Sequence, residues 1–239
     1  MKNKILVVFV AVLLIITGCK KDDVMPKQMT ISFLCEVDFS LVLTGIGIAI
    51  IDWGDSSTDT VTLPDCKIGE SGALYIRHIY SELSTDHITI TITGENITGL
   101  GLFDYLTNLD VSRNEALKEL MCSGIQLTTL NIRNNRALTR LDCDHNQLTN
   151  LDVSQNEALT QLHCGYNQLT NLNVSKNINL DVLLVISNQF TTASLNALFK
   201  TLCNTANGNI YISNNPGTAD CDRSIAEKKG WRFYGELKD

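Results

Sequence analysis

The stretch LTNLDVSQN at residues 148–156 is followed by LTQLHCGYN at residues 159–167, and this pair of half-motifs decides the fold. The pair recurs every 21 residues from Leu106 to Asn188. Leu alternates with Val, Ile or Cys in each half, which places the apolar side chains on one side of an extended chain. One coil cannot bury its own apolar side, so we expect successive coils to stack.

Each half-motif reads L-x-x-L-x-(L/V/C)-x-x-N and resembles the core of the leucine-rich repeat, in a short bacterial form with a nested half-period. The resemblance covers about 85 residues and implies an internalin-like solenoid of 21-residue coils over residues 96–189. Two half-motifs per coil predict two parallel sheets on opposite walls. The asparagines that end the halves are expected to cap backbone groups of neighbouring coils; they are Asn114, Asn135, Asn156, Asn177, Asn146, Asn167 and Asn188.

Residues 28–95 contain several β-rich runs and are predicted to form a small β-sandwich that covers the first coil. The segments IDWGD at 51–55 and HIY at 78–80 resemble the turn and the His-x-Tyr of polycystic-kidney-disease-type immunoglobulin-like domains. Ser56 stands where that family usually has glycine. Asp52 and Asp55 suggest either a calcium site or a hydrogen-bonded turn. Two carboxylates are far fewer than the oxygens that calcium needs, which favours the turn.

Residues 190–239 leave the repeat and are predicted to form an α/β cap on the open end of the solenoid. Residues 194–202 have helical apolar spacing, 209–212 and 231–233 read as strands, and 220–229 reads as a helix that ends at Gly230. The fold class is therefore mixed and mainly β: a small immunoglobulin-like sandwich, a leucine-rich-repeat solenoid and a cap.

The first residues combine a basic start with an apolar run from Ile5 to Ile16, which is too short to span a membrane and reads as an export signal over residues 1–18. Ile16-Thr-Gly-Cys19 resembles a bacterial lipobox, which implies lipid attachment at Cys19 and a linker over residues 19–27. An ordinary signal with a stray cysteine is the alternative. The string Lys20-Lys-Asp-Asp23 resembles a surface-export signature. We expect an outer membrane lipoprotein at the surface of a Gram-negative bacterium.

The chain has 239 residues and a net charge of −7, and this acidic balance argues against a nucleic-acid partner. Neither a nucleophile elbow nor a P-loop nor an H-E-x-x-H motif occurs, and we expect no catalytic residues and no cofactor. Cys122, Cys143 and Cys164 lie 21 residues apart at inward positions. We interpret them as small core residues, because a straight column does not offer the tetrahedral closure of a metal thiolate site.

The compartment expected from the export signal is oxidising, so four other cysteines are candidates for disulfide bridges. The sequence leaves their pairing open; they are Cys35, Cys66, Cys203 and Cys221. Bridges between Cys35 and Cys66 and between Cys203 and Cys221 are two of the pairings that the sequence leaves open.

The outward positions of the Cys-bearing half-motifs vary more than those of the other half, where small polar residues repeat. They mix carboxylate, imidazole, phenol and aliphatic groups, as an interaction surface does. The candidate binding face consists of Met121, Asp142, Asp144, His163, Tyr166 and Leu184. A solvated face is the alternative. An Asp142–His163 metal or acid/base pair is a weaker hypothesis, because the pattern implies no third partner, and we therefore expect no metal site.

The favoured function is a lipid-anchored surface module that binds a protein or a glycan. An envelope spacer or assembly scaffold is the alternative, and a hydrolase is less favoured because repeat columns form flat ladders rather than a cleft.

Overall fold

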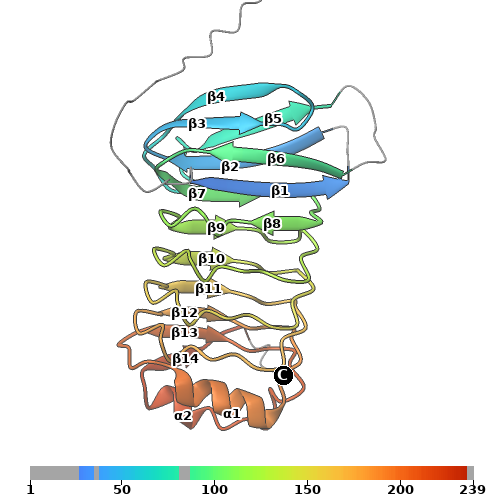
Figure 1. Ribbon diagram of the computed structural model, residues 1–239. Helices are drawn as coiled ribbons and strands as arrows, with labels where there is room; N and C mark the ends of the chain where they lie inside the picture. The colour runs from blue at the N-terminus through green and yellow to red at the C-terminus, as the bar shows by residue number, and fades with distance from the viewer. Residues whose placement is uncertain (1–26, 35–37, 81–86, 236–239) are drawn as a thin grey trace, which may run out of the picture.

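The computed structural model describes residues 27–34, 38–80 and 87–235. The expected signal segment, Cys19 and the linker up to residue 26 lie outside the described residues. A two-sheet sandwich lies at one end of the molecule, and the larger of its sheets continues through a stack of short strands to two helices at the other end (Figure 1). The described part is therefore mainly β.

The two sheets have five and nine strands among the described residues. The smaller has the order β4 (Thr58–Leu63), β3 (Gly47–Asp52), β6 (His87–Thr93), β1 (Gln28–Leu34), β8 (Asn108–Asp110). The larger has the order β14 (Trp231–Phe233), β13 (Gly208–Tyr211), β12 (Val182–Leu184), β11 (Gln161–His163), β10 (Arg140–Asp142), β9 (Glu119–Met121), β7 (Ile97–Leu102), β2 (Asp38–Gly45), β5 (Leu74–Ile79).

The repeats supply the parallel part of the larger sheet, where β9 to β12 pair with the register Leu120, Leu141, Leu162 and Leu183. These leucines are fully buried, and their neighbours in each strand are half-buried, except Glu119, which is buried. The strands are only three residues long, because each half-motif supplies one short extended segment before the chain turns.

The sandwich and the repeats share one sheet. Strand β7 pairs antiparallel with β2 of the sandwich and parallel with β9 of the first coil. Gly99 in β7 is required by this junction, because a Cβ there would lie 2.3 Å from Thr44 Oγ1 and 3.0 Å from the side chain of Ile68. A single cluster of buried apolar side chains extends from Met29 to Trp231.

The prediction of two parallel sheets is wrong for the wall opposite β9–β12. Strand β8 is the one strand that the described repeats form on that wall, and it pairs antiparallel with β1. In the successive coils a side chain accepts the backbone N–H two residues later: Asp110 from Ser112, Asn131 from Arg133, Asp152 from Ser154 and Asn173 from Ser175. These turns compete with strand pairing.

The predicted capping by asparagine is confirmed. Asn156 Nδ2 donates to the carbonyls of Ile132 and Asn135, at 2.9 Å each. In the other column Asn167 Nδ2 donates to Cys143 O at 2.9 Å, and its Oδ1 accepts the N–H of Leu148 at 2.9 Å. Each coil is thus tied to the one before it by buried side chains.

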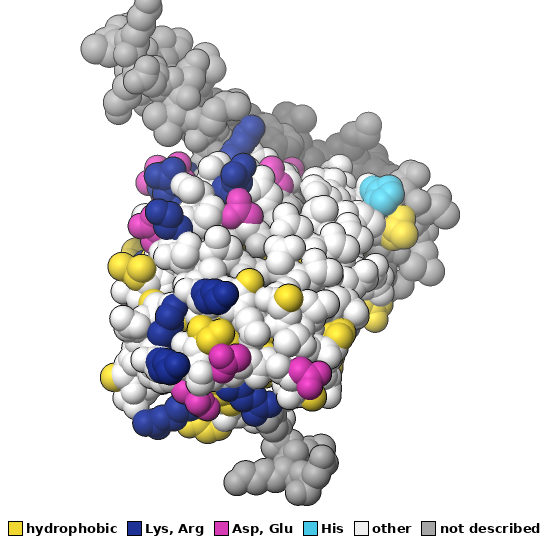
Figure 2. Space-filling model, turned by 90° about the horizontal axis from the view of Figure 1, so that it is seen from below, with side chains coloured by type: hydrophobic (Ala, Val, Ile, Leu, Met, Phe, Trp, Pro, Cys, Tyr) yellow, Lys and Arg dark blue, Asp and Glu magenta, His cyan; other side chains and the backbone are white. Residues whose placement is uncertain are grey.

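The C-terminal end carries α1 (Thr192–Thr201) and α2 (Ser224–Glu227), packed beside β13 and β14. Helix α2 is shorter than the sequence suggests, and Gly230 follows it with φ +87°. Seen end-on, this region shows Lys and Arg side chains towards one side (Figure 2). Neither helix, in the described part, has the length and apolar content to span a bilayer.

The suggested Cys203–Cys221 bridge is not formed. Cys203 is a reduced thiol, and its Sγ lies 3.3 Å from Leu180 O. Cys66 is also a reduced thiol, while Cys35 lies outside the described residues.

Candidate functional site

The outward side chains of β9–β12 form continuous rows across the coils. The register places Met121, Asp142, His163 and Leu184 in one row. All four are half-buried, although they are outward-facing. The structure therefore brings together on one face the six residues that the sequence singled out, with Asp144 and Tyr166 just beyond the ends of β10 and β11.

Asp142, Asp144 and His163 form a compact cluster on this face. One ligand atom of each lies within 4.8 Å of the other two, and His163 Nδ1 is 3.9 Å from Asp142 Oδ2. Burial, followed by the negative charge of Asp142, raises the pKa of Asp144 to about 6. Burial lowers the pKa of His163, and Asp142 opposes that shift. The imidazole is consequently neutral at pH 7.

Tyr166 projects from a strained turn next to the cluster. Gly124, His145, Tyr166 and Ser187 occupy the same position in successive coils, and all have positive φ, with Tyr166 at 50°. A bulky side chain in the left-handed region costs about 1 kcal/mol. The ring of Tyr166 stacks on His145 with centroids 4.0 Å apart and remains 42% exposed. The turn thus displays an aromatic pair to solvent.

Apolar side chains continue the row beyond the cluster. Leu184 pairs in register with Tyr211 of the cap, and Tyr211 lies 5.8 Å from the Tyr234 ring. Leu184 and Ile186 are half-buried. A polar centre therefore has aliphatic and aromatic neighbours on the side of the cap.

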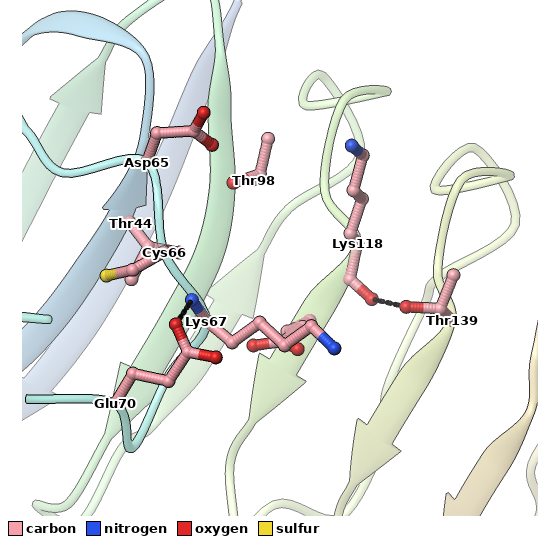
Figure 3. Close-up of a pocket in the computed structure, with 9 residues that line it drawn as sticks. Thr44, Asp65, Cys66, Lys67, Glu70, Thr98, Lys118 and Thr139 are labelled. Carbon is pink, nitrogen blue, oxygen red and sulfur yellow. Dashed lines mark hydrogen bonds between the residues drawn. The ribbon is translucent and has the colours of Figure 1, made fainter. Parts of the chain in front are cut away.

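A cleft of about 330 Å³ lies where the sandwich meets the first coils (Figure 3). Lys67 and Glu70 line it from the segment between β4 and β5, and Lys118 lines it from the first coil. The buried carboxylate Glu119 accepts the N–H of Ile68 at 2.8 Å, so it secures this segment to the repeats. The cleft was not predictable from the sequence, because its walls come from segments about fifty residues apart that share no motif.

The side chains of IDWGD and HIY come together in the sandwich. Trp53 stacks on His78 with centroids 4.5 Å apart, and Tyr80 Oη donates to Trp53 O. Asp52 accepts the N–H of Gly54, and Asp55 accepts from Ser57. Burial alone would raise the pKa of Asp55, but hydrogen bonds from Ser57 and His78 lower it to about 2. Both carboxylates thus take part in a hydrogen-bonded turn.

These coils stack buried leucines beneath a ladder of short parallel strands. Among solved structures, the functional domain of InlJ from Listeria monocytogenes, described as including a cysteine ladder, is 38% identical over 50% of this chain and 25% of that chain, with a TM-score of 0.42. A leucine-rich-repeat protein from Leptospira interrogans is 21% identical over 52% of this chain and 38% of that one, with a TM-score of 0.41.

The chain therefore spans between a quarter and two fifths of the length of these two proteins. No protein-family model and no curated protein matches it.

Proposed function

We propose that this chain is a non-catalytic binding module that recognises a partner protein through the outer face of β9–β12. The observation that carries the proposal is the row of Met121, Asp142, His163 and Leu184, which is continued by Tyr211. Interfaces combine aromatic and apolar anchors with a few partly buried polar groups, and this row has that composition.

The contrast with the opposite wall supports the choice of face. There Asp110, Asn131, Asp152 and Asn173 are exposed and accept backbone N–H groups of their own turns. Asp142 accepts the N–H of Asp144 in the same way, but its side chain is half-buried beside His163 instead of exposed. On the proposed face Tyr166 retains a positive φ that glycine would adopt without strain. Strain of this kind is typical of functional positions.

The cysteine column supports a role without catalysis. Cys122, Cys143 and Cys164 are fully buried, and burial raises the pKa of each thiol well above its usual value. Such thiols are poor nucleophiles, because the thiolate is the reactive form.

Retention on arrays tests the proposal. Immobilised proteins and glycans are probed with the wild-type chain, with Asp142→Ala and His163→Ala, and with the matched control Asp152→Ala from the opposite wall. We expect some immobilised proteins to retain the wild-type chain and Asp152→Ala but to retain neither Asp142→Ala nor His163→Ala. Equal retention of all variants would exclude this face, and retention on glycans alone would replace protein by carbohydrate as the ligand class. No retention at all would favour the spacer or scaffold.

We also propose that Cys19 carries a lipid that holds the module at the outer surface of the cell. The lipobox-like sequence supports this proposal, and acyl chains at a mature N-terminus would anchor the chain stably. Metabolic labelling with an alkyne fatty acid should mark the wild type and not Cys19→Ser. Protease added to intact cells should remove the wild-type protein; a protected, labelled protein would place it on the periplasmic side instead.

A further inference from the structure

Two carboxylates and one imidazole converge on the outer face from two neighbouring coils. Asp142 ends β10, Asp144 follows two residues later, and His163 ends β11 in register with Asp142. One carboxylate oxygen of each aspartate and one imidazole nitrogen lie within 4.8 Å of one another. Ligand atoms around a tetrahedral Zn²⁺ lie about 3.4 Å apart, given metal–ligand distances of about 2.0–2.1 Å. Small side-chain movements would close the set around one ion, since His163 Nδ1 and Asp142 Oδ2 are already 3.9 Å apart.

The backbone holds these groups in place. Gly165 N–H donates to Asp144 Oδ1 at 2.6 Å, and Asp144 N–H donates to Asp142 Oδ1 at 3.3 Å. Gly165 also leaves the space that this approach needs, because a Cβ there would lie 2.8 Å from Ile186 and 3.4 Å from the Asp144 carboxylate. Ordered second partners of this kind orient metal ligands.

Asp142 and Asp144 bring two carboxylates close together, and no Lys or Arg among the described residues forms an ion pair with either one. Asp142 and Asp144 repel each other, which together with burial raises the pKa of Asp144 to about 6. The positive charge of Arg140 acts on His163, and the Nε atom of Arg140 is buried without a hydrogen-bond partner. A divalent cation bound between the three side chains would offset the repulsion between the two carboxylates.

We propose that Asp142, Asp144 and His163 bind one divalent transition-metal ion, with Zn²⁺ or Mn²⁺ as the ions of matching chemistry. One nitrogen and two oxygens suit these ions, whereas Ca²⁺ takes six to eight oxygens. The side chains of His163 and Asp142 keep 20% and 17% exposure, so at least one coordination position faces outward. Metal binding goes beyond the proposed function and does not depend on a partner.

Calorimetric titration of the full chain, freed of metal with EDTA, tests the site with ZnSO₄, MnCl₂ and CaCl₂. We expect one equivalent of Zn²⁺ or Mn²⁺ to bind, with weaker binding of Ca²⁺. Asp144→Asn and His163→Gln should each weaken binding at least about tenfold. Asp152→Asn on the opposite wall should leave it unchanged. Circular dichroism of each near-isosteric variant verifies the fold.

Absorption spectra of the Co²⁺-loaded protein give a second readout, because the d–d bands report the ligands directly. His163→Gln should shift or abolish bands that Asp152→Asn retains. Unchanged affinity and unchanged bands in both cluster variants would overturn the proposal, as would the absence of saturable binding below millimolar metal. Since no partner enters either measurement, failure here leaves the array test of recognition unaffected.

Discussion

At the scale of single residues, Asp144 makes the apo protein sensitive to pH. Its pKa of about 6 exceeds the ordinary value of 3.8, chiefly through burial and then through Asp142. Between about pH 4 and pH 6 the folded state therefore binds more protons than the unfolded chain, and the free energy of unfolding falls as pH rises. Asp142 and His163 lie beside the same carboxyl, while burial raises the pKa of the Cys143 thiol.

Asp144→Asn should stabilise the metal-free protein at pH 7.5. Asn can still accept the Gly165 N–H, and it removes the charge repulsion. A two-unit shift is worth about 2.7 kcal/mol at full strength, and solvent screening of a partly exposed group reduces our expectation to about 1 kcal/mol. Urea unfolding with EDTA measures the gain, which should vanish near pH 4. A variant that is less stable than the wild type at pH 7.5 would contradict this account.

Asn156→Ala should destabilise the solenoid, because it leaves the buried carbonyls of Ile132 and Asn135 without their donor. Each buried carbonyl that loses its donor lowers the free energy of unfolding by about 1–3 kcal/mol. Asn167→Ala should cost more, since Asn167 also accepts the Leu148 N–H. Chemical denaturation ranks the variants, with the exposed Asn150→Ala in the same coil as a control expected to change stability by less than about 0.5 kcal/mol. The reverse order would show that the two asparagine columns are not the ties described here.

At the scale of elements, the stacking of the coils buries the column of three cysteine thiols away from solvent. Cys122, Cys143 and Cys164 are fully buried, and burial raises their pKa values. Iodoacetamide at pH 8 should leave all three unmodified in the native protein and modify them in urea. Cys66 at the junction is partly exposed and should react in the native state. Peptide mass mapping measures this, and rapid native labelling of Cys143 would mean that the coils open.

The coils were predictable from sequence because each rung repeats the same local pattern of Leu, Cys and Asn. The second sheet was not, because a half-motif with Asp152 or Asn173 satisfies its own backbone through a side chain. The pairing of strand β7 with both β2 and β9 was not predictable either, because these two partners come from different parts of the chain. Periodicity reports which residues are buried, and it does not report which neighbour a backbone pairs with.

The candidate face was predictable for the same reason, since a 21-residue interval places Asp142 beside His163 once the strands pair. The 21-residue repeat did not predict that Asp144 would join Asp142 and His163 in one cluster. Asp144 belongs to the next row, and it reaches His163 because Gly165 in the following coil leaves space and donates a hydrogen bond. The sequence pattern alone gave no reason to connect Asp144 with that glycine.

At the scale of the whole molecule, one sheet and one core connect the sandwich to the cap. The larger sheet runs without a break from β5 to β14, and the buried cluster spans the same length. Nearest-neighbour coupling can still let a repeat protein unfold in parts. Here the asparagine columns and the continuous core tie each coil to the next, which favours a single transition.

The two tryptophans test that cooperativity, because Trp53 is buried in the sandwich and Trp231 in the cap. In Trp53→Phe the remaining fluorescence reports the cap, and in Trp231→Phe it reports the sandwich. Each variant loses an indole hydrogen bond, to Asp59 or to Cys203 O, so its midpoint is compared only with its own far-ultraviolet circular dichroism. We expect coincident urea midpoints in both variants, as two-state unfolding requires. A cap whose fluorescence changes before the circular dichroism does would mean that the solenoid frays from its C-terminal end, and that the shared sheet does not make the molecule one cooperative unit.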